Sequence, residues 1–103
     1  MALPTLTAEQ RQAALEKAAA ARATRAEMKV RLKSGEVKLS ELLALAADDD
    51  ALAKMKVISM LESMPGVGSA TARRILQDVG ISEARRVRGL GPNQRAALLE
   101  RFG

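Results

Sequence analysis

The sequence predicts an all-α fold of about five helices in one domain of 103 residues. Three observations support this. The first third is built from strong helix formers, apolar residues recur at helical spacing in the rest, and no stretch alternates with a period of two for long enough to be a strand. Many of the apolar residues are alanine and the only aromatic is Phe102, so the core consists of Leu, Ile, Val and Met.

The first predicted helix spans residues 8–34. Thr7 and Gln10 form a capping-box pattern at its start, and Gly35 supplies the stop. A helix of this length measures about 40 Å at 1.5 Å per residue, which exceeds what a domain of this size covers. Part of the helix should therefore protrude.

The large apolar residues indicate which part of this helix docks. Leu15 stands alone in the first half, whereas Met28, Val30 and Leu32 cluster near the end. The C-terminal third should pack on the core. We accordingly divide the single domain into a partly protruding segment, residues 1–34, and a compact part, residues 35–103.

A stripe of basic residues follows the same helix at spacings of three and four: Arg22, Arg25, Lys29 and Lys33. The simpler interpretation is a solvated face, since charge runs usually lie in water. The sharper one is a secondary DNA-binding surface. The sequence leaves both open.

Four shorter helices are expected after Gly35. They cover about 39–48, about 52–64, the segment from Gly68 to Gly80, and a last helix that Pro92 opens with Leu98, Leu99 and Phe102 inward. The acidic tract at 48–50 should cap the third of the five helices rather than hold a metal, because consecutive aspartates do not converge on one cation.

Composition limits the chemistry. The chain has no cysteine and no histidine, so neither a disulfide nor a zinc site is expected, and we predict no metal and no cofactor. It has no long apolar run and no signal-peptide pattern, which predicts a cytoplasmic protein without membrane contact.

The net charge of +5 lies entirely in the second half of the chain. Residues 1–50 contain eight basic and eight acidic side chains, and residues 51–103 contain nine basic and four acidic ones. A charge needed only for solubility would not concentrate in this way. A polyanion such as nucleic acid is the partner that this asymmetry favours.

The stretch "MPGVGSATARRIL" contains the strongest motif. With Leu61 it reproduces the spacing of a helix-hairpin-helix unit, in which apolar residues fill the angle between two helices and glycines adopt backbone angles that side chains would oppose. The bare amides of the hairpin would form a nest for a phosphate. The plain alternative is a connecting turn. The candidate contacts are Gly66, Val67, Gly68, Ser69, Thr71, Arg73, Arg74, Arg85, Arg86 and Arg88.

These segments resemble a known family. The alanine-rich "EQRQAALEKAAAARATRAE", then "LAKMKVISMLE", "MPGVGSATARRILQDVGI" and "RRVRGLGPNQRAALLERFG" are similar to the actinobacterial, mycobacterial-type integration host factors along almost the whole chain. The resemblance implies a helix-two-turns-helix core in residues 35–103. It also implies a nucleoid-associated protein that binds duplex DNA with little sequence preference, bends or compacts it, and supports phage integrase in site-specific recombination.

Carried over residue by residue, the resemblance places Gly66, Val67 and Gly68 on a phosphate. It places Arg85, Arg86 and Arg88 on the DNA backbone or in a groove. One departure matters: members often have lysines where this chain has Ser69 and Thr71. Hydroxyls still donate to phosphate, but two charges are lost, for which Arg73 or Arg74 would compensate.

Two other functions remain open at this point. A basic helical scaffold also suits structured RNA on the ribosome, and the alanine-rich helix would suit protein docking. The resemblance also implies a likeness in shape to the helix-two-turns-helix domain of certain DNA glycosylases. An enzyme is nevertheless not expected, because this chain has no room for the flipped-base pocket of those enzymes. No sustained heptad pattern calls for a coiled coil, so a monomer is expected.

Overall fold

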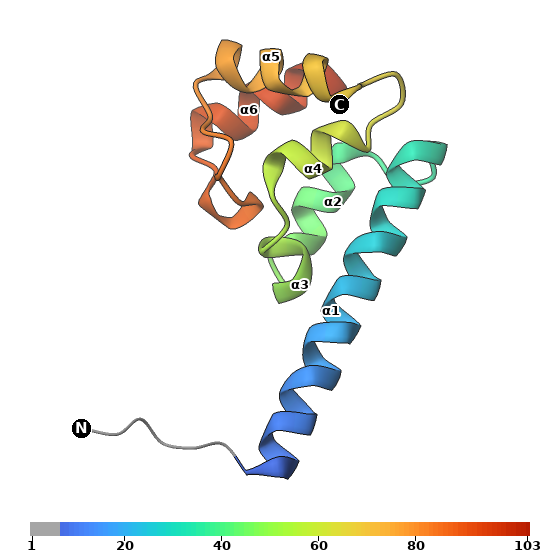
Figure 1. Cartoon of the computed structure of the whole chain (residues 1–103). Coiled ribbons are helices and arrows are strands. Elements are labelled where there is room, and N and C mark those ends of the chain that lie inside the picture. Colours follow the sequence, from blue (N-terminus) through green and yellow to red (C-terminus); the bar gives the residue numbers. More distant parts are fainter. Residues whose placement is uncertain (1–6) are drawn as a thin grey trace, which may run out of the picture.

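The computed structural model describes residues 7–103, and this part of the chain is all α-helical. Figure 1 shows one long helix leaning against a cluster of short ones. The elements are α1 (Ala8–Ser34), α2 (Leu39–Ala46), α3 (Asp50–Ala53), α4 (Val57–Glu62), α5 (Ser69–Val79), a 3-10 turn η1 (Val87–Gly89) and α6 (Pro92–Phe102). The predicted fold class is confirmed.

Helix α1 begins and ends where the sequence predicts. The Thr7 hydroxyl accepts a hydrogen bond from the Gln10 amide at 3.0 Å, and the Gln10 side chain accepts one from the Thr7 amide at 2.9 Å. Gly35 ends the helix in the left-handed conformation, with φ of 81°. The N-terminal half extends beyond the other helices (Figure 1).

The docking of α1 differs from the prediction at one residue. Met28 and Leu32 are buried, but Val30 is 68% exposed, and Leu15 in the protruding half is 61% exposed. Val30 is two residues from each buried neighbour, which is about 200° around a helix, so it faces water. Its predicted place in the core was wrong. Residues 1–6 of the predicted segment 1–34 lie outside the described residues.

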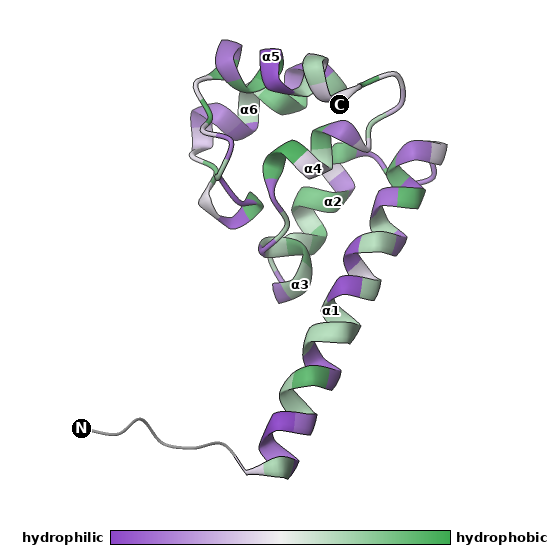
Figure 2. Cartoon of the chain, viewed as in Figure 1, coloured by the Kyte–Doolittle hydropathy of each residue, from purple (hydrophilic) through white to green (hydrophobic). Residues whose placement is uncertain are grey.

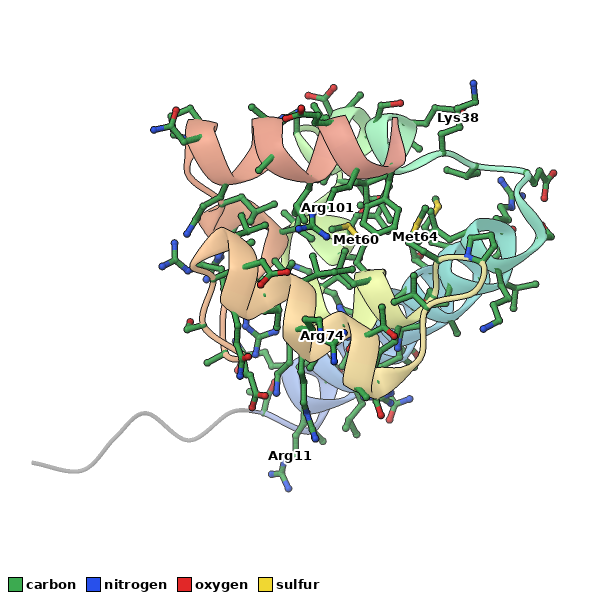
Figure 3. The ribbon with its side chains drawn as sticks, turned by 90° about the horizontal axis from the view of Figure 1, so that it is seen from above. Arg11, Lys38, Met60, Met64, Arg74 and Arg101 are labelled. Carbon is green, nitrogen blue, oxygen red and sulfur yellow. The ribbon has the colours of Figure 1, made fainter. Side chains whose placement is uncertain are left out.

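The core lies among α2, α4, α5 and the end of α1. Figure 2 shows hydrophobic colour gathered on α2 and α4 at the centre of the molecule, while α1 alternates along its length. Met60 and Met64 point into this interior (Figure 3). The largest fully buried side chains are Leu32, Leu39, Leu42, Leu43, Leu52, Met55, Val57, Met60, Leu61, Leu76 and Leu98.

The single helix predicted over about 52–64 is two helices, α3 and α4. Between them Met55 and Val57 pair with a distant segment: the Val57 amide donates to the Arg85 carbonyl at 2.9 Å, and the Val87 amide donates to the Met55 carbonyl at 2.8 Å. Lys56 and Arg86 therefore form an isolated antiparallel bridge. These tertiary hydrogen bonds replace helical ones, and that interrupts the helix.

The carboxylate cap is confirmed at one aspartate of the acidic tract. Asp49 Oδ1 accepts hydrogen bonds from the amides of Ala51 and Leu52 at 3.0 and 3.3 Å and begins α3. Its neighbour Asp50 lies in the first turn and forms an ion pair with Lys54, with 3.0 Å between Oδ2 and Nζ. The two aspartates therefore make different contacts, and only Asp49 caps the helix.

Helix α6 packs beside α5 and closes the core. Leu98 is fully buried, while Leu99 and Phe102 are partly buried against the core, as predicted. The Gln94 side chain donates to the Gly80 carbonyl at 2.9 Å, and Arg101 pairs with Asp78 at 3.4 Å (Figure 3). No helix in the described part of the chain combines the length and the apolarity that crossing a membrane requires.

Candidate nucleic-acid interface

The hairpin between α4 and α5 has the geometry that its sequence predicts. Its apolar residues, Leu61, Met64, Val67, Ala72 and Ile75, are all buried. The Val67 amide donates to the Met64 carbonyl at 3.1 Å, which closes the turn. Pro65 and both glycines are exposed at the tip. The apolar residues thus hold the two helices together and leave the backbone of the turn open to solvent.

The two glycines have different reasons to be glycine. Gly66 has φ of 76°, in the left-handed region that side chains oppose. Gly68 has φ of −90° and ψ of 179°, which any residue adopts. The prediction that both glycines need unusual backbone angles is wrong for Gly68. A Cβ there would meet nothing within 4 Å, so its absence leaves open space beside the start of α5.

Helix α5 begins without a side-chain cap. Gly68 is the N-cap residue and has no side chain that could accept a hydrogen bond from the first-turn amides. The first amide of the helix with a backbone acceptor is that of Ala72, which donates to the Gly68 carbonyl at 2.9 Å. The preceding amides of the first turn face solvent with the positive end of the helix dipole behind them. Ser69 and Thr71 are exposed beside them. An anion is the ligand that this arrangement suits.

The two arginines of α5 are in different states. Arg73 Nε lies 3.4 Å from a carboxylate oxygen of Glu83, so its charge is partly neutralised. Arg74 forms no ion pair within the described residues and lies on the exposed face of α5 (Figure 3). Of the two, Arg74 is the better substitute for the lysines that the hairpin lacks.

The arginines after α5 belong to a structured loop. Arg85 Nη1 donates to the Gly89 carbonyl and Arg86 Nη1 donates to the Lys54 carbonyl, both at 2.6 Å. Arg88 lies in η1 and is exposed, with no ion pair among residues 7–103. Arg85 and Arg86 therefore shape the loop as well as charging it, whereas Arg88 has its guanidinium available for a ligand.

The hairpin and the arginine loop lie at opposite ends of α5 (Figure 1). The helix has 11 residues, so the two ends are separated by about 16 Å. The structure therefore does not bring all the predicted residues into one pocket. It spreads them from one end of α5 to the other, and we name this set of residues the extended face. Contacts to successive phosphates of a polymer would require such a spread.

Sequence reasoning missed Lys54 and Lys56 as members of this face. The backbone bridge places Lys56 opposite Arg86, and the Lys54 carbonyl binds the Arg86 side chain. A signal was present in "KMKV", where exposed lysines alternate with the buried Met55 and Val57. That period of two is typical of an extended segment with one face outward.

The basic stripe of α1 is not uniform in the structure. Arg22, Lys29 and Lys33 are exposed, but Arg25 is half-buried and its Nη1 donates to the Ala51 carbonyl at 3.3 Å. Arg25 thus helps to dock α1 on α3. Within residues 7–103, no group of three or more acidic side chains is arranged to hold a metal ion.

Comparison with known proteins gives consistent results. Residues 32–102 match the family model of the S13-like H2TH domain. The chain is 57% identical to the integration host factor of Streptomyces coelicolor over 103 residues, which is 100% of this chain and 96% of that protein. It is 56% identical to the integration host factor of Mycobacterium tuberculosis, covering 100% of this chain and 98% of that one.

The fold is also similar to that of a solved structure. This structure is that of sIHF bound to an 8-base-pair palindromic DNA, with a TM-score of 0.83 and 53% sequence identity, covering 85% of this chain and 99% of that one. Because 85% of the chain is covered, the similarity reaches beyond residues 35–103 into the long helix. The chain belongs to the integration host factor family of actinobacteria, with an S13-like H2TH domain in its C-terminal two thirds.

Proposed function

We propose that this protein binds duplex DNA with little sequence specificity, as an architectural protein of the nucleoid. The observation that supports this most is the uncapped, glycine-flanked start of α5, with open space at Gly68 and free first-turn amides. Such a site binds one phosphate through backbone donors, which read no base. The relative that was solved with an 8-base-pair DNA supports duplex DNA as the source of that phosphate.

The extended face suits several phosphates at once. The hairpin supplies one contact, and Arg74 and the arginine loop supply others further along α5. Phosphate contacts position a protein on DNA but carry no sequence information. Arg88, with its guanidinium exposed on η1, is the side chain we assign to a groove, where arginine favours a narrowed minor groove and bent DNA.

Helix α1 extends the proposal to compaction. Arg22, Lys29 and Lys33 remain exposed on it, and its N-terminal half projects away from the helical core (Figure 1). Arg11 extends outward near the tip of that half (Figure 3). We infer that this basic helix makes a secondary contact with DNA. Arg25 belongs to the stripe in sequence, but its hydrogen bond to α3 gives it a structural part as well.

The biological role follows from these contacts. A monomer that bends DNA at one face and contacts it again through α1 would compact the nucleoid and would help a phage integrase to assemble on bent sites. Membership of the family identifies the chain as a binding protein and not an enzyme. No cofactor enters the proposed mechanism.

Bending is tested with a duplex of about 30 base pairs labelled at both ends for energy transfer. Binding should raise the transfer efficiency, and the rise should be the same for two unrelated sequences. The matched variants are Arg88→Gln and Arg31→Gln, because Arg31 is already paired with Glu27 and lies about 200° around α1 from Lys29 and Lys33. Loss of transfer with Arg88→Gln alone supports the proposal. Unchanged transfer on saturated wild-type binding would contradict bending.

Structured RNA is the competing ligand, because the matched family model is S13-like and S13 is a ribosomal protein. Competition between a labelled duplex DNA and an unlabelled RNA hairpin of equal length separates the two. The proposal predicts that DNA binds more tightly. Stronger competition by RNA would assign the face to the ribosome instead. For the protein-docking alternative, the test is a pull-down repeated after nuclease treatment.

A further inference from the structure

Asp50 is an acidic residue surrounded by basic ones. It lines the groove between α1 and α3 together with Lys17 and Lys54. It also lines a second groove, beside η1 and α6, together with Arg88 and Arg95. Asp50 therefore borders both grooves, and its carboxylate is close enough to Lys54, Lys17 and Arg88 for their charges to act on it.

The charges around Asp50 are close enough to affect its ionisation. The ion pair and hydrogen bond to Lys54 lower the pKa of the Asp50 carboxyl below its usual value, and the charges of Lys17 and Arg88 lower it further. The carboxyl is exposed and ionised at neutral pH. At that pH its negative charge is permanently present among these cations.

Helix α3 does not need Asp50 as its cap. Asp49 already accepts the amides of Ala51 and Leu52, so the start of α3 is satisfied without its neighbour. The ion pair between Asp50 and Lys54 is exposed on both sides, and such pairs contribute little to stability. A structural role therefore accounts for Asp49 but not for Asp50.

We propose that Asp50 lowers the affinity of the extended face for DNA. It does so by holding Lys54 in an ion pair and by repelling phosphates that approach Arg88. This inference rests on the proposed function. A Lys54 ammonium held by a carboxylate neutralises less of the charge of a phosphate, so fewer of the counterions condensed on the DNA are released on binding. The repulsion acts within a Debye length, about 10 Å at 0.1 M salt, so it is strongest at low salt.

The test compares Asp50→Asn with Asp48→Asn on the same duplex. Both variants remove one exposed negative charge from the same acidic tract. They differ because Asp50 lines both grooves and Asp48 lines neither. At about 50 mM salt, Asp50→Asn should bind roughly three- to tenfold more tightly than wild type, and Asp48→Asn less than about twofold more tightly. The advantage of Asp50→Asn should shrink as salt is raised.

A double-mutant cycle identifies the cations through which Asp50 acts. In a background of Lys54→Gln and Arg88→Gln, the effect of Asp50→Asn should fall to less than about twofold. An undiminished effect there would contradict action through these two residues. If Asp50→Asn does not fold, as judged by circular dichroism, Asp50→Ser replaces it, because Asp49 and not Asp50 caps α3 and the side chain of Asp50 is exposed.

The outcomes separate this inference from the function on which it rests. If wild type binds duplex DNA, and Asp50→Asn binds no more tightly than Asp48→Asn, the role of Asp50 is refuted and DNA binding stands. If Asp50→Asn binds more weakly, the carboxylate orients Lys54 for binding, and the proposal is equally refuted. If wild type itself fails to bind DNA, the proposed function is what fails.

Discussion

At the scale of single residues, the hairpin shows how one residue type serves two purposes. A Cβ would meet nothing within 4 Å at either glycine, but Gly66 has a left-handed backbone that opposes a side chain, whereas Gly68 is extended and stands as the N-cap of α5. Replacing a glycine that is needed for its backbone angle should lower the free energy of unfolding, and replacing one that is needed for a ligand should lower the affinity for DNA. The two glycines therefore offer a separation of folding from function within three residues.

We predict that Gly66→Ala lowers the free energy of unfolding by about 1 kcal/mol, because alanine is strained at positive φ. Gly68→Ala should lower it by a similar amount for a different reason, because alanine is a much poorer N-cap than glycine although φ of −90° does not strain it. Gly68→Ala should also weaken DNA binding several-fold, because its Cβ stands where a phosphate approaches the first-turn amides. Urea denaturation and DNA titration measure the two quantities. Unchanged affinity in Gly68→Ala would remove the hairpin from the interface.

The arginines allow a second comparison. Arg86 donates to the Lys54 carbonyl and thereby fastens the loop to the end of α3, while Arg88 makes no such bond. Arg86→Lys should destabilise the protein by about 1 kcal/mol, because lysine cannot reproduce the planar guanidinium donor. Arg88→Lys should change stability by less than about 0.5 kcal/mol. Thermal denaturation decides, and equal melting temperatures would contradict the structural part assigned to Arg86.

At the scale of elements, the clearest contrast lies along α1. Leu15 and Leu32 are on the same helix, but the first is 61% exposed and the second fully buried. Leu32→Ala should cost about 2–5 kcal/mol through lost burial and the cavity left behind. Leu15→Ala should stay within about 0.5 kcal/mol. A comparable loss from both would mean that the protruding half of α1 is covered in solution, for instance by a second molecule.

Most elements were predictable from local pattern. Capping residues and glycines marked α1, helical spacing of leucines marked α2, and the spacing of apolar residues around two glycines marked the hairpin helices. The break between α3 and α4 was not found, because it depends on hydrogen bonds from Met55 and Val57 to residues about thirty positions away. Val30 was misplaced because clustering in sequence was used instead of angle around the helix.

The candidate site was predicted in its residues more than in its arrangement. The hairpin and the arginines were recognisable from motif and charge, but their separation by the length of α5 follows only from the fold. The hydrogen bonds that Arg25, Arg85 and Arg86 donate to backbone carbonyls also follow only from the folded structure. Propensity and spacing do not report such contacts, because the partners are remote or the loop conformation sets them.

At the scale of the whole molecule, the interface that we propose is basic and has no histidine or cysteine to titrate near neutral pH, because the chain contains neither residue. Lys54 and the other nearby cations lower the pKa of the Asp50 carboxyl, so this carboxyl stays ionised throughout the pH range used to measure binding. Because Arg, Lys and phosphate also keep their charges, DNA affinity should vary by less than about twofold between pH 5.5 and 7. Titrations at fixed ionic strength measure this. A steep change would require a group outside this account.

The sign of the acid response also follows from Asp50. Its carboxyl has a lower pKa folded than unfolded, so its ion pair with Lys54 stabilises the folded state above the unfolded pKa. That contribution is lost as pH falls through the folded pKa. Any weakening of the fold from this pair therefore belongs below about pH 4 and does not overlap the range used to measure binding.

The central claim is that the basic face binds the phosphates of duplex DNA, and fluorescence anisotropy across a salt series tests it most directly. Two unrelated duplexes and one matched single strand are titrated with the full chain. Four to seven phosphate contacts predict equal slopes of log affinity against log salt of about −4 to −6 for both duplexes, and weaker single-strand binding. A slope near zero, or no duplex binding, would contradict the claim and reduce the hairpin to a connecting turn.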